Sequence, residues 1–258
     1  MPFNAISYGL EDKVATIRFN RPDSLNALDA EMRREVMEAV LEAREEARVL
    51  VITGTGRGFC AGQDLGDLSA PEKVNLERLL TEEYHPVLKS IADCPIPVIS
   101  AVNGIAAGAG ANLALAADMV IAKRSAVFLQ AFARIGLMPD AGGTYWLPRL
   151  VGPARAMGMS LLADPIPADM AAEWGLIWEV IDDDLFEDRT RELARRLADG
   201  PTLAFKAMKQ AIRASSTNDF ADQLALEARL QSELGRSRDF MEGVLAFLSK
   251  RKADFEGR

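Results

Sequence analysis

The chain has almost none of the residues that form disulfides or bind structural metals. Its 258 residues include two cysteines and one histidine, which is too few for a Cys/His metal site. Cys60 and Cys94 also stand outside any CxxC arrangement. We therefore expect no disulfide, no structural zinc and no other bound metal.

Long apolar runs are absent as well. No stretch approaches the roughly 20 apolar residues that a transmembrane helix needs. The first residues lack the basic segment and apolar run of a secretory signal. These absences lead us to expect a cytoplasmic protein that does not enter a membrane.

Positive charge is scarce. Lysine and arginine number 30 against 38 aspartates and glutamates, which gives a formal net charge of -8. No basic segment is dense enough to neutralise a run of phosphates, so we expect no nucleic-acid partner. The chain is 49% hydrophobic and long enough to bury a substantial core in one functional unit.

Two glycine-rich segments carry most of the functional signal, residues 54–65 (GTGRGFCAGQDL) and residues 103–114 (NGIAAGAGANLA). Each follows a short β-branched apolar run and leads toward a helical pattern, which places free backbone N–H groups at a turn. Two such turns can form an oxyanion hole, because glycine lets the backbone approach a substrate carbonyl closely. Taken singly, each segment is better explained as a packing turn.

Periodicity predicts strands that alternate with helices through the first two thirds of the chain. The expected strands are 14–19, 49–53, 98–102 and 119–122, and the expected helices are 29–47, 71–92 and 109–117. After residue 183 the pattern becomes helical, with expected helices at 184–198, 202–214, 220–234 and 240–251. The fold class indicated is α/β with a helical C-terminal region.

The two glycine-rich segments, together with residues 15–28 and 242–251, resemble the crotonase (enoyl-CoA hydratase/isomerase) superfamily over nearly the full length. The resemblance implies a spiral core of β-β-α units in residues 1–183. It implies a helical trimerisation region in residues 184–258, and hence a homotrimer or a dimer of trimers. The implied ligand is an acyl-CoA thioester, with no cofactor other than the coenzyme A of the substrate.

The resemblance also implies roles for particular residues. The backbone N–H groups of Gln63 and Ala109 would hold the thioester oxygen, and the residue types at these positions need not be special. The implied contacts to CoA or the acyl group are Ser24, Leu25, Ala61, Gln63, Asp64, Leu65, Ala109 and Phe132, with Phe247 and Lys250 reaching the CoA of a neighbouring subunit. Asp64 is also well explained as a carboxylate that caps the adjacent turn.

The reaction type depends on the acids and bases around the oxyanion hole. Hydratases of the superfamily use two glutamates, and the matching positions hold Asn112 and Phe132. Neither side chain exchanges a proton as a carboxylate does. Simple enoyl-CoA hydration is therefore the less favoured activity.

One carboxylate, Asp140, remains in the expected neighbourhood. Its spacing before two glycines indicates a helix N-cap, whereas resemblance to the isomerase branch implies a group that moves a proton between carbons. Residues 132–140, 145–152 and 173–178 resemble the isomerases that convert 1,2-epoxyphenylacetyl-CoA into oxepin-CoA and shift double bonds of enoyl-CoA.

His85 allows further hypotheses about the function. A lone helix histidine is usually a surface or packing residue, but His85 also falls where the 4-chlorobenzoyl-CoA dehalogenases of the superfamily carry a general base. In that reading Asp140 attacks an aryl carbon and His85 activates water. A non-enzymatic CoA-binding partner subunit is the remaining alternative.

Overall fold

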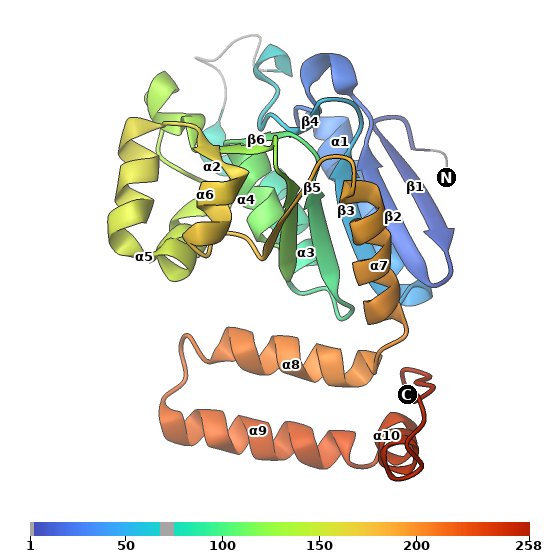
Figure 1. Ribbon diagram of the computed structural model, residues 1–258. Coiled ribbons are helices and arrows are strands. Elements are labelled where there is room, and N and C mark those ends of the chain that lie inside the picture. Colours follow the sequence, from blue (N-terminus) through green and yellow to red (C-terminus); the bar gives the residue numbers. More distant parts are fainter. Residues whose placement is uncertain (1–2, 68–74) are drawn as a thin grey trace.

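The strands of the computed structural model, which describes residues 3–67 and 75–258, form two sheets (Figure 1). The larger sheet has the order β1-β2-β3-β5-β7-β10 and the smaller has the order β4-β6-β8-β9. β1 and β9 are antiparallel to their neighbours, and the other pairs are parallel. The strands are β1 Ile6–Glu11, β2 Val14–Phe19, β3 Val49–Gly54, β4 Gly58–Cys60, β5 Val98–Val102, β6 Ile105–Ala107, β7 Met119–Lys123, β8 Val127–Leu129, β9 Ile166–Pro167 and β10 Glu179–Ile181.

Three successive units each contribute one strand to each sheet before the chain becomes helical again. β3 is followed by β4, β5 by β6, and β7 by β8, which confirms the predicted spiral of β-β-α units. The α-helices are α1 Ala30–Glu46, α2 Leu76–Leu79, α3 His85–Ala92, α4 Ala109–Leu115, α5 Gly143–Leu162, α6 Ala168–Glu173, α7 Phe186–Ala198, α8 Thr202–Ala214, α9 Phe220–Leu234 and α10 Arg238–Leu248. Short 3₁₀ turns cover Pro22–Ser24, Leu65–Asp67 and Ala131–Ile135, and a π turn covers Leu80–Tyr84.

The central strands of the larger sheet are buried on both faces, as expected for parallel strands covered on each side. In β3, Leu50 and Ile52 pack into the main core, while Val49 and Val51 pack with Phe186 of α7 on the opposite face. The β-branched runs predicted as strands form β2, β3, β5 and β7. Burial on both faces explains why these runs are almost continuously apolar.

The predicted helix over residues 71–92 is only partly confirmed. Within the described residues it starts at Leu76, and the π turn interrupts it directly before His85. Residues 71–74 lie outside the described residues. A π turn inside a helix frequently marks a functional site.

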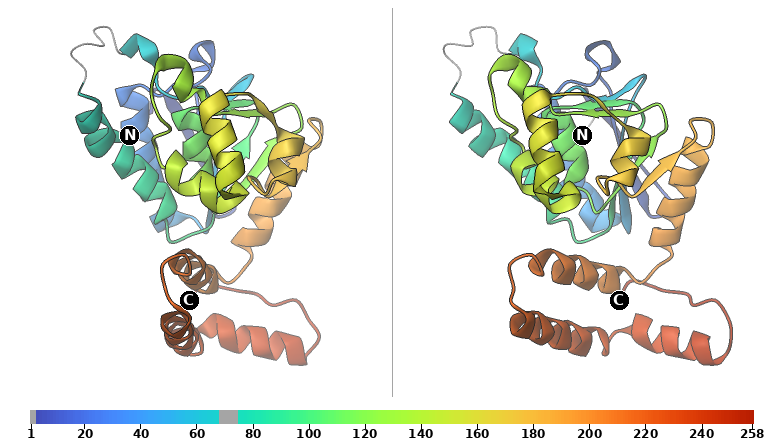
Figure 2. Two further views of the ribbon diagram at one scale, coloured as in Figure 1. Left: turned by 90° about the vertical axis from the view of Figure 1, so that its left-hand side faces the viewer. Right: turned by 60° about the vertical axis from the view of Figure 1, so that its left-hand side comes forward.

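The last three helices form a layer separate from the α/β body (Figures 1 and 2). α7 packs on the large sheet, whereas α8 to α10 stand away from it. Lys209 of α8 binds the body through the carbonyls of Cys94 and Ile96, at 2.6 and 2.7 Å. The division at residue 183 and the trimerisation role of this layer stay predictions.

Across the described residues, none of the helices is both long enough and apolar enough to cross a membrane. In the same residues no group of three or more His, Cys, Asp or Glu is arranged to hold a metal ion.

Candidate active site

The two glycine-rich segments meet at Gly62. Its φ is +93°, and a Cβ built on it would lie 2.8 Å from the Ala107 carbonyl oxygen and 3.3 Å from the Ala109 nitrogen. No side chain fits into that space, so glycine is required both by the backbone angle and by the close approach. The turn after β4 and the start of α4 are therefore in backbone contact.

This contact places the two predicted oxyanion donors side by side. Leu28 forms an isolated parallel bridge with Gln63: the Leu28 N–H donates to the Gly62 oxygen at 2.7 Å, and the Leu28 oxygen accepts from Asp64 N at 3.1 Å. Ala109 is the first residue of α4, where an N–H has no partner within the helix. Among the described residues, neither the Gln63 nor the Ala109 N–H donates a backbone hydrogen bond. Two free donors at one point suit a developing oxyanion.

The side chain of Gln63 is held by a network that the sequence did not predict. Its Oε1 accepts hydrogen bonds from Arg33 Nη1 at 3.0 Å and from the Tyr84 hydroxyl at 2.6 Å. Its Nε2 donates to the Asp64 carbonyl at 2.9 Å. Arg33 is 2% exposed and pairs with Glu83 at 2.6 Å. The network thus joins the first turn to the π turn before His85.

Burial raises the pKa of Tyr84 above its ordinary value, so its hydroxyl stays protonated and remains a donor to Gln63. The partners of Gln63 come from α1 and from the π turn, far away in sequence. The sequence hinted at this network only through the polar side chain of Gln63, a residue that was expected to contribute its backbone N–H alone.

Ser24 and Leu25, which are predicted to contact CoA, lie directly beside the first turn. The Ala61 N–H donates to the Leu25 carbonyl at 3.0 Å, and Leu25 has a left-handed φ of 53°. Ser24 is one residue earlier, with its hydroxyl on the Arg21 carbonyl at 3.1 Å. The structure therefore brings the predicted segments 24–25 and 61–65 together.

Asp64 acts as the expected cap. Its Oδ1 accepts from Gly66 N at 3.0 Å in the 3₁₀ turn Leu65–Asp67, and its Oδ2 pairs with Arg21 at 2.8 Å. The hydrogen bond from Arg21 is the main reason that the pKa of Asp64 is lowered. Both oxygens of the Asp64 carboxylate therefore have partners within the protein. The neighbouring Leu65 is 58% exposed.

Two buried asparagines hold the connection between β3 and β4 within the first glycine-rich segment, and sequence reasoning missed them. Asn26 donates to the carbonyls of Thr55 and Gly58 at 3.0 and 2.8 Å. Asn103 accepts from Gly54 N at 2.9 Å and donates to Gly56 O at 3.0 Å. A polar residue placed directly after the apolar strand β5 was the available signal for Asn103.

The loop between the 3₁₀ turn Ala131–Ile135 and α5 carries Asp140. The N-cap of α5 is Gly142, which makes no side-chain cap hydrogen bond, so the interpretation of Asp140 as an N-cap is wrong. Two residues with left-handed φ, Ala141 and Gly142, separate Asp140 from the helix.

Burial raises the pKa of Asp140 to about 6, and the nearby positive charge of His85 partly opposes this shift. A carboxyl group whose pKa lies near neutrality is suited to taking up and returning a proton. The same interaction shows that His85, an exposed residue at the start of α3, lies near Asp140.

The places of the two hydratase glutamates hold no acid here. Asn112 is completely buried, and Phe132 is 7% exposed. The Phe132 ring lies over the second turn, because a Cβ built on Gly108 would be 3.7 Å from its Cζ. Phe132 therefore places an apolar ring beside the turn that leads into Ala109.

The protein-family model for enoyl-CoA hydratase/isomerase matches residues 9–258. The chain belongs to the enoyl-CoA hydratase/isomerase family. A probable enoyl-CoA hydratase of Rhodobacter capsulatus is 58% identical over the whole of both chains. The 1,2-epoxyphenylacetyl-CoA isomerase of Escherichia coli is 47% identical over 96% of this chain and 97% of that relative.

A solved structure agrees with the fold of this family member. A Mycobacterium abscessus protein assigned as an enoyl-CoA hydratase/isomerase superposes with a TM-score of 0.93 at 40% identity. The match covers 98% of this chain and 100% of that one. Membership of the family supports an enzyme that acts on acyl-CoA thioesters.

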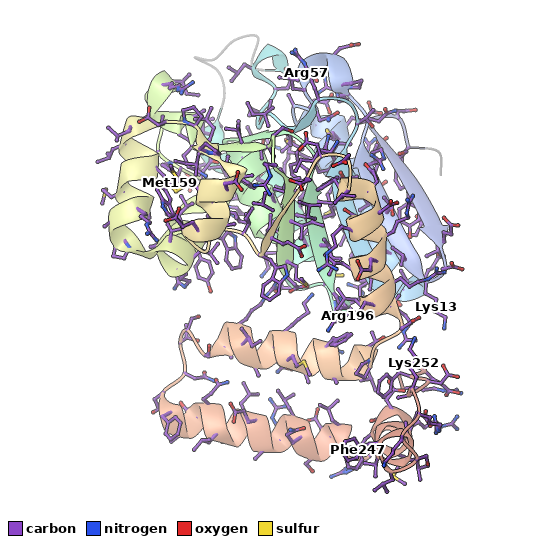
Figure 3. All side chains as sticks on the ribbon, viewed as in Figure 1. Lys13, Arg57, Met159, Arg196, Phe247 and Lys252 are labelled. Carbon is purple, nitrogen blue, oxygen red and sulfur yellow. The ribbon has the colours of Figure 1, made fainter. Side chains whose placement is uncertain are left out.

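Two predicted CoA contacts of this family member lie far from its own active site. Phe247 of α10 is at the opposite end of the molecule from Arg57, which belongs to the first glycine-rich segment (Figure 3). Phe247 is 84% exposed, and Lys250 follows the end of α10. Within one chain, Phe247 is therefore not brought to the oxyanion turns. Its role at a CoA site requires a second copy.

Proposed function

We propose that this family member is an acyl-CoA isomerase that moves a proton with a single carboxylate, Asp140. The observation that carries the proposal is the combination of two free backbone donors with one partly buried carboxyl group of raised pKa. Asn112 and Phe132 at the places of the hydratase glutamates agree with it. The similarity to the Escherichia coli isomerase also supports it.

The proposed reaction needs one base and one oxyanion hole. The Asp140 carboxylate removes a proton from the carbon next to the thioester of a 3-enoyl-CoA. The electron pair shifts to the thioester oxygen, which the N–H groups of Gln63 and Ala109 stabilise. Asp140 then returns the proton to the far carbon of the double bond, which gives the 2-enoyl-CoA. The substrate brings its own coenzyme A, and no other cofactor enters this scheme.

We propose 1,2-epoxyphenylacetyl-CoA as the native type of substrate. Its acidic C–H is also next to the thioester, so the same base and hole apply to it. The purified protein should convert this epoxide into oxepin-CoA, followed by the change in ultraviolet absorbance and by chromatography. Conversion of 3-enoyl-CoA without conversion of the epoxide would contradict the substrate and leave the isomerase chemistry standing. Trace activity on every acyl-CoA, with tight CoA binding, would instead indicate a partner subunit.

Hydratase activity should increase when both missing acids are supplied. We expect the Asn112→Glu/Phe132→Glu double variant to hydrate crotonyl-CoA faster than the wild type, because it restores two proton-transfer groups. The assay is loss of the enoyl absorbance together with gain of one water by mass. A double variant that is folded and binds CoA but shows no gain would contradict the assignment of these two positions to the hydratase acids.

A dehalogenase-like aryl-CoA hydrolase is the second candidate, because His85 lies near Asp140. In the isomerase proposal His85→Asn is nearly silent above neutral pH. The pKa of Asp140 then rises slightly, since a neighbouring positive charge is lost. With 4-chlorobenzoyl-CoA, mass spectrometry of the variant should show no covalent adduct. An aryl ester trapped on Asp140 would favour the hydrolase instead.

We further propose that the protein is a homotrimer or a dimer of trimers. Side chains of α8, α9 and α10 line an apolar groove of about 440 Å³, which includes Leu203, Phe240, Val244 and Phe247. An exposed apolar surface of this kind is typical of an interface between subunits. Light scattering at micromolar concentration should give the mass of three or six chains. A monomer would contradict the proposal.

A further inference from the structure

The backbone carbonyl of Asp140 accepts two hydrogen bonds. One comes from Gly143 N at 2.8 Å, in the turn that leads into α5. The other comes from Asn112 Nδ2, also at 2.8 Å, across the interior from α4. The second bond ties the residue that carries the carboxylate to the helix that begins at the oxyanion donor Ala109.

Asn112 is in turn held by Gln130, the residue that follows β8. Gln130 Nε2 donates to Asn112 Oδ1 at 2.9 Å, and the two side chains are 1% and 0% exposed. The Asp140 carbonyl, which ends this series of hydrogen bonds, sets the orientation of both side-chain amides. A carbonyl only accepts, so Asn112 presents its NH₂ group to Asp140 and its oxygen to the NH₂ group of Gln130.

The backbone around this contact is shaped to admit Asn112. A Cβ built on Gly143 would lie 2.5 Å from Asn112 Nδ2, so any other residue there would displace the amide. Ala141 has a φ of +49°, which is uncommon for a residue with a side chain. A strained turn of this type persists only where its surroundings hold it.

We infer that Asn112 and Gln130 are positioning residues that fix the Asp140 carboxylate relative to the oxyanion donors. The inference rests on the proposed isomerase function. It makes Asn112 a determinant of reaction type for two reasons. Asn112 replaces one of the glutamates that hydratases use, and it holds the proposed isomerase base, Asp140, in place. The pair acts through the backbone of Asp140 and does not touch the reacting atoms.

Stability alone does not explain Gln130. Its Oε1 is buried and has no hydrogen-bond partner among the described residues, and a buried acceptor without a partner destabilises the folded state. Gln130→Met removes this oxygen at similar volume, but it also removes the donor to Asn112 Oδ1, so one buried acceptor without a partner replaces another. We therefore expect the variant to unfold close to the wild-type temperature, while its catalysis is impaired.

The test compares Asn112→Ala and Gln130→Met with the wild type on a 3-enoyl-CoA. We expect kcat to fall about 10-fold to 100-fold for Asn112→Ala, since small misplacement of a reacting group is costly. The fall should be smaller, roughly 3-fold to 10-fold, for Gln130→Met, which leaves Asn112 in place. KM should change little in both variants.

A pH profile separates positioning from general loss of structure. The charged or titratable groups that act on Asp140 are His85 from α3 and Tyr84 from the π turn. In Asn112→Ala the Asp140 backbone loses its hydrogen bond from Asn112, and the carboxylate should become more hydrated. Hydration lowers its pKa, so the acid limb of kcat/KM should move to lower pH. Ser100→Ala is the matched control, because Ser100 is a fully buried polar residue of β5 without a hydrogen-bond partner for its hydroxyl within the described part of the chain. The control should keep the wild-type kcat and pH profile.

Reduced kcat in both variants together with the shifted acid limb supports the inference. A wild-type kcat in either variant, or an unmoved acid limb in Asn112→Ala, overturns it. If Asn112→Ala does not fold, kcat of Gln130→Met decides alone. Full activity of Asp140→Asn would instead show that the proposed function is wrong, so the two failures are distinguishable.

Discussion

Asp140→Asn is expected to lower the rate of double-bond isomerisation by about 100-fold or more, because general acid-base catalysis typically contributes 10²–10⁴-fold. Asparagine has nearly the same shape as aspartate but cannot accept and return the proton. The backbone carbonyl that binds Asn112 and Gly143 is unchanged by the substitution. The measurement is kcat and kcat/KM with a 3-enoyl-CoA, and affinity for CoA should stay the same.

The pH dependence of the wild type follows from the raised pKa of Asp140. The base must be ionised to remove a proton, so kcat/KM should rise as pH increases through about 6 and then level off. The acid limb should be absent from whatever activity Asp140→Asn retains. A wild-type limb near the ordinary pKa of an aspartate would indicate that Asp140 is not the titrating group.

The stability of Asp140→Asn supplies an internal control. The pKa of Asp140 is higher in the folded protein than the ordinary value, so its ionisation opposes folding increasingly as pH rises from the ordinary pKa of an aspartate to about 6, and by a constant amount above that pH. At pH 8 the variant should therefore melt at the wild-type temperature or above it. Low activity with a lower Tm would indicate damage to the fold and would leave the role of Asp140 without support.

Gly62→Ala is expected to cost about 10²-fold to 10³-fold in kcat, the range found when one oxyanion donor is lost. The added Cβ would lie 2.8 Å from the Ala107 carbonyl oxygen, at a φ of +93°. The turn has to move, and the N–H of Gln63 moves with it. The oxyanion hole stabilises mainly the transition state, so kcat should fall strongly while the affinity for CoA changes little.

Gly175→Ala is the matched control for Gly62→Ala. Gly175 follows α6 and has a φ of +79°, but its added Cβ would meet only the Leu150 carbonyl oxygen, at an ordinary 3.5 Å. It shares the cost of a positive φ and has no contact with either turn. Equal losses of kcat in the two variants would show that Gly62 contributes through fold stability and not through the oxyanion hole.

The large sheet was predictable because burial on both faces leaves a plain signal. Its central strands are continuous β-branched runs, and β3 and β5 were predicted to within one residue. The small sheet was not predicted. β4, β6 and β8 have three residues each, which is too short for a periodic pattern, and the first two lie inside segments expected to be turns.

The active site was predictable only in part, for a physical reason. Glycine-rich segments indicated the turns, because close backbone approach excludes side chains. The contacts Gln63 with Arg33 and Asn112 with Asp140 join residues about 30 positions apart. The hydrophobic periodicity of a sequence does not indicate contacts between residues so far apart. The N-cap interpretation of Asp140 failed because the chain makes two left-handed residues before α5 begins.

The central claim is that the wild-type protein isomerises enoyl-CoA and does not hydrate it. The most direct test incubates one preparation with a 3-enoyl-CoA and, separately, with crotonyl-CoA, and resolves the products by chromatography and mass spectrometry. The single-carboxylate site predicts rapid formation of 2-enoyl-CoA at unchanged mass and very slow addition of water to crotonyl-CoA. Hydration of crotonyl-CoA at about 10 per second or faster, the median for enzymes, without isomerisation of the 3-enoyl-CoA, would contradict the claim.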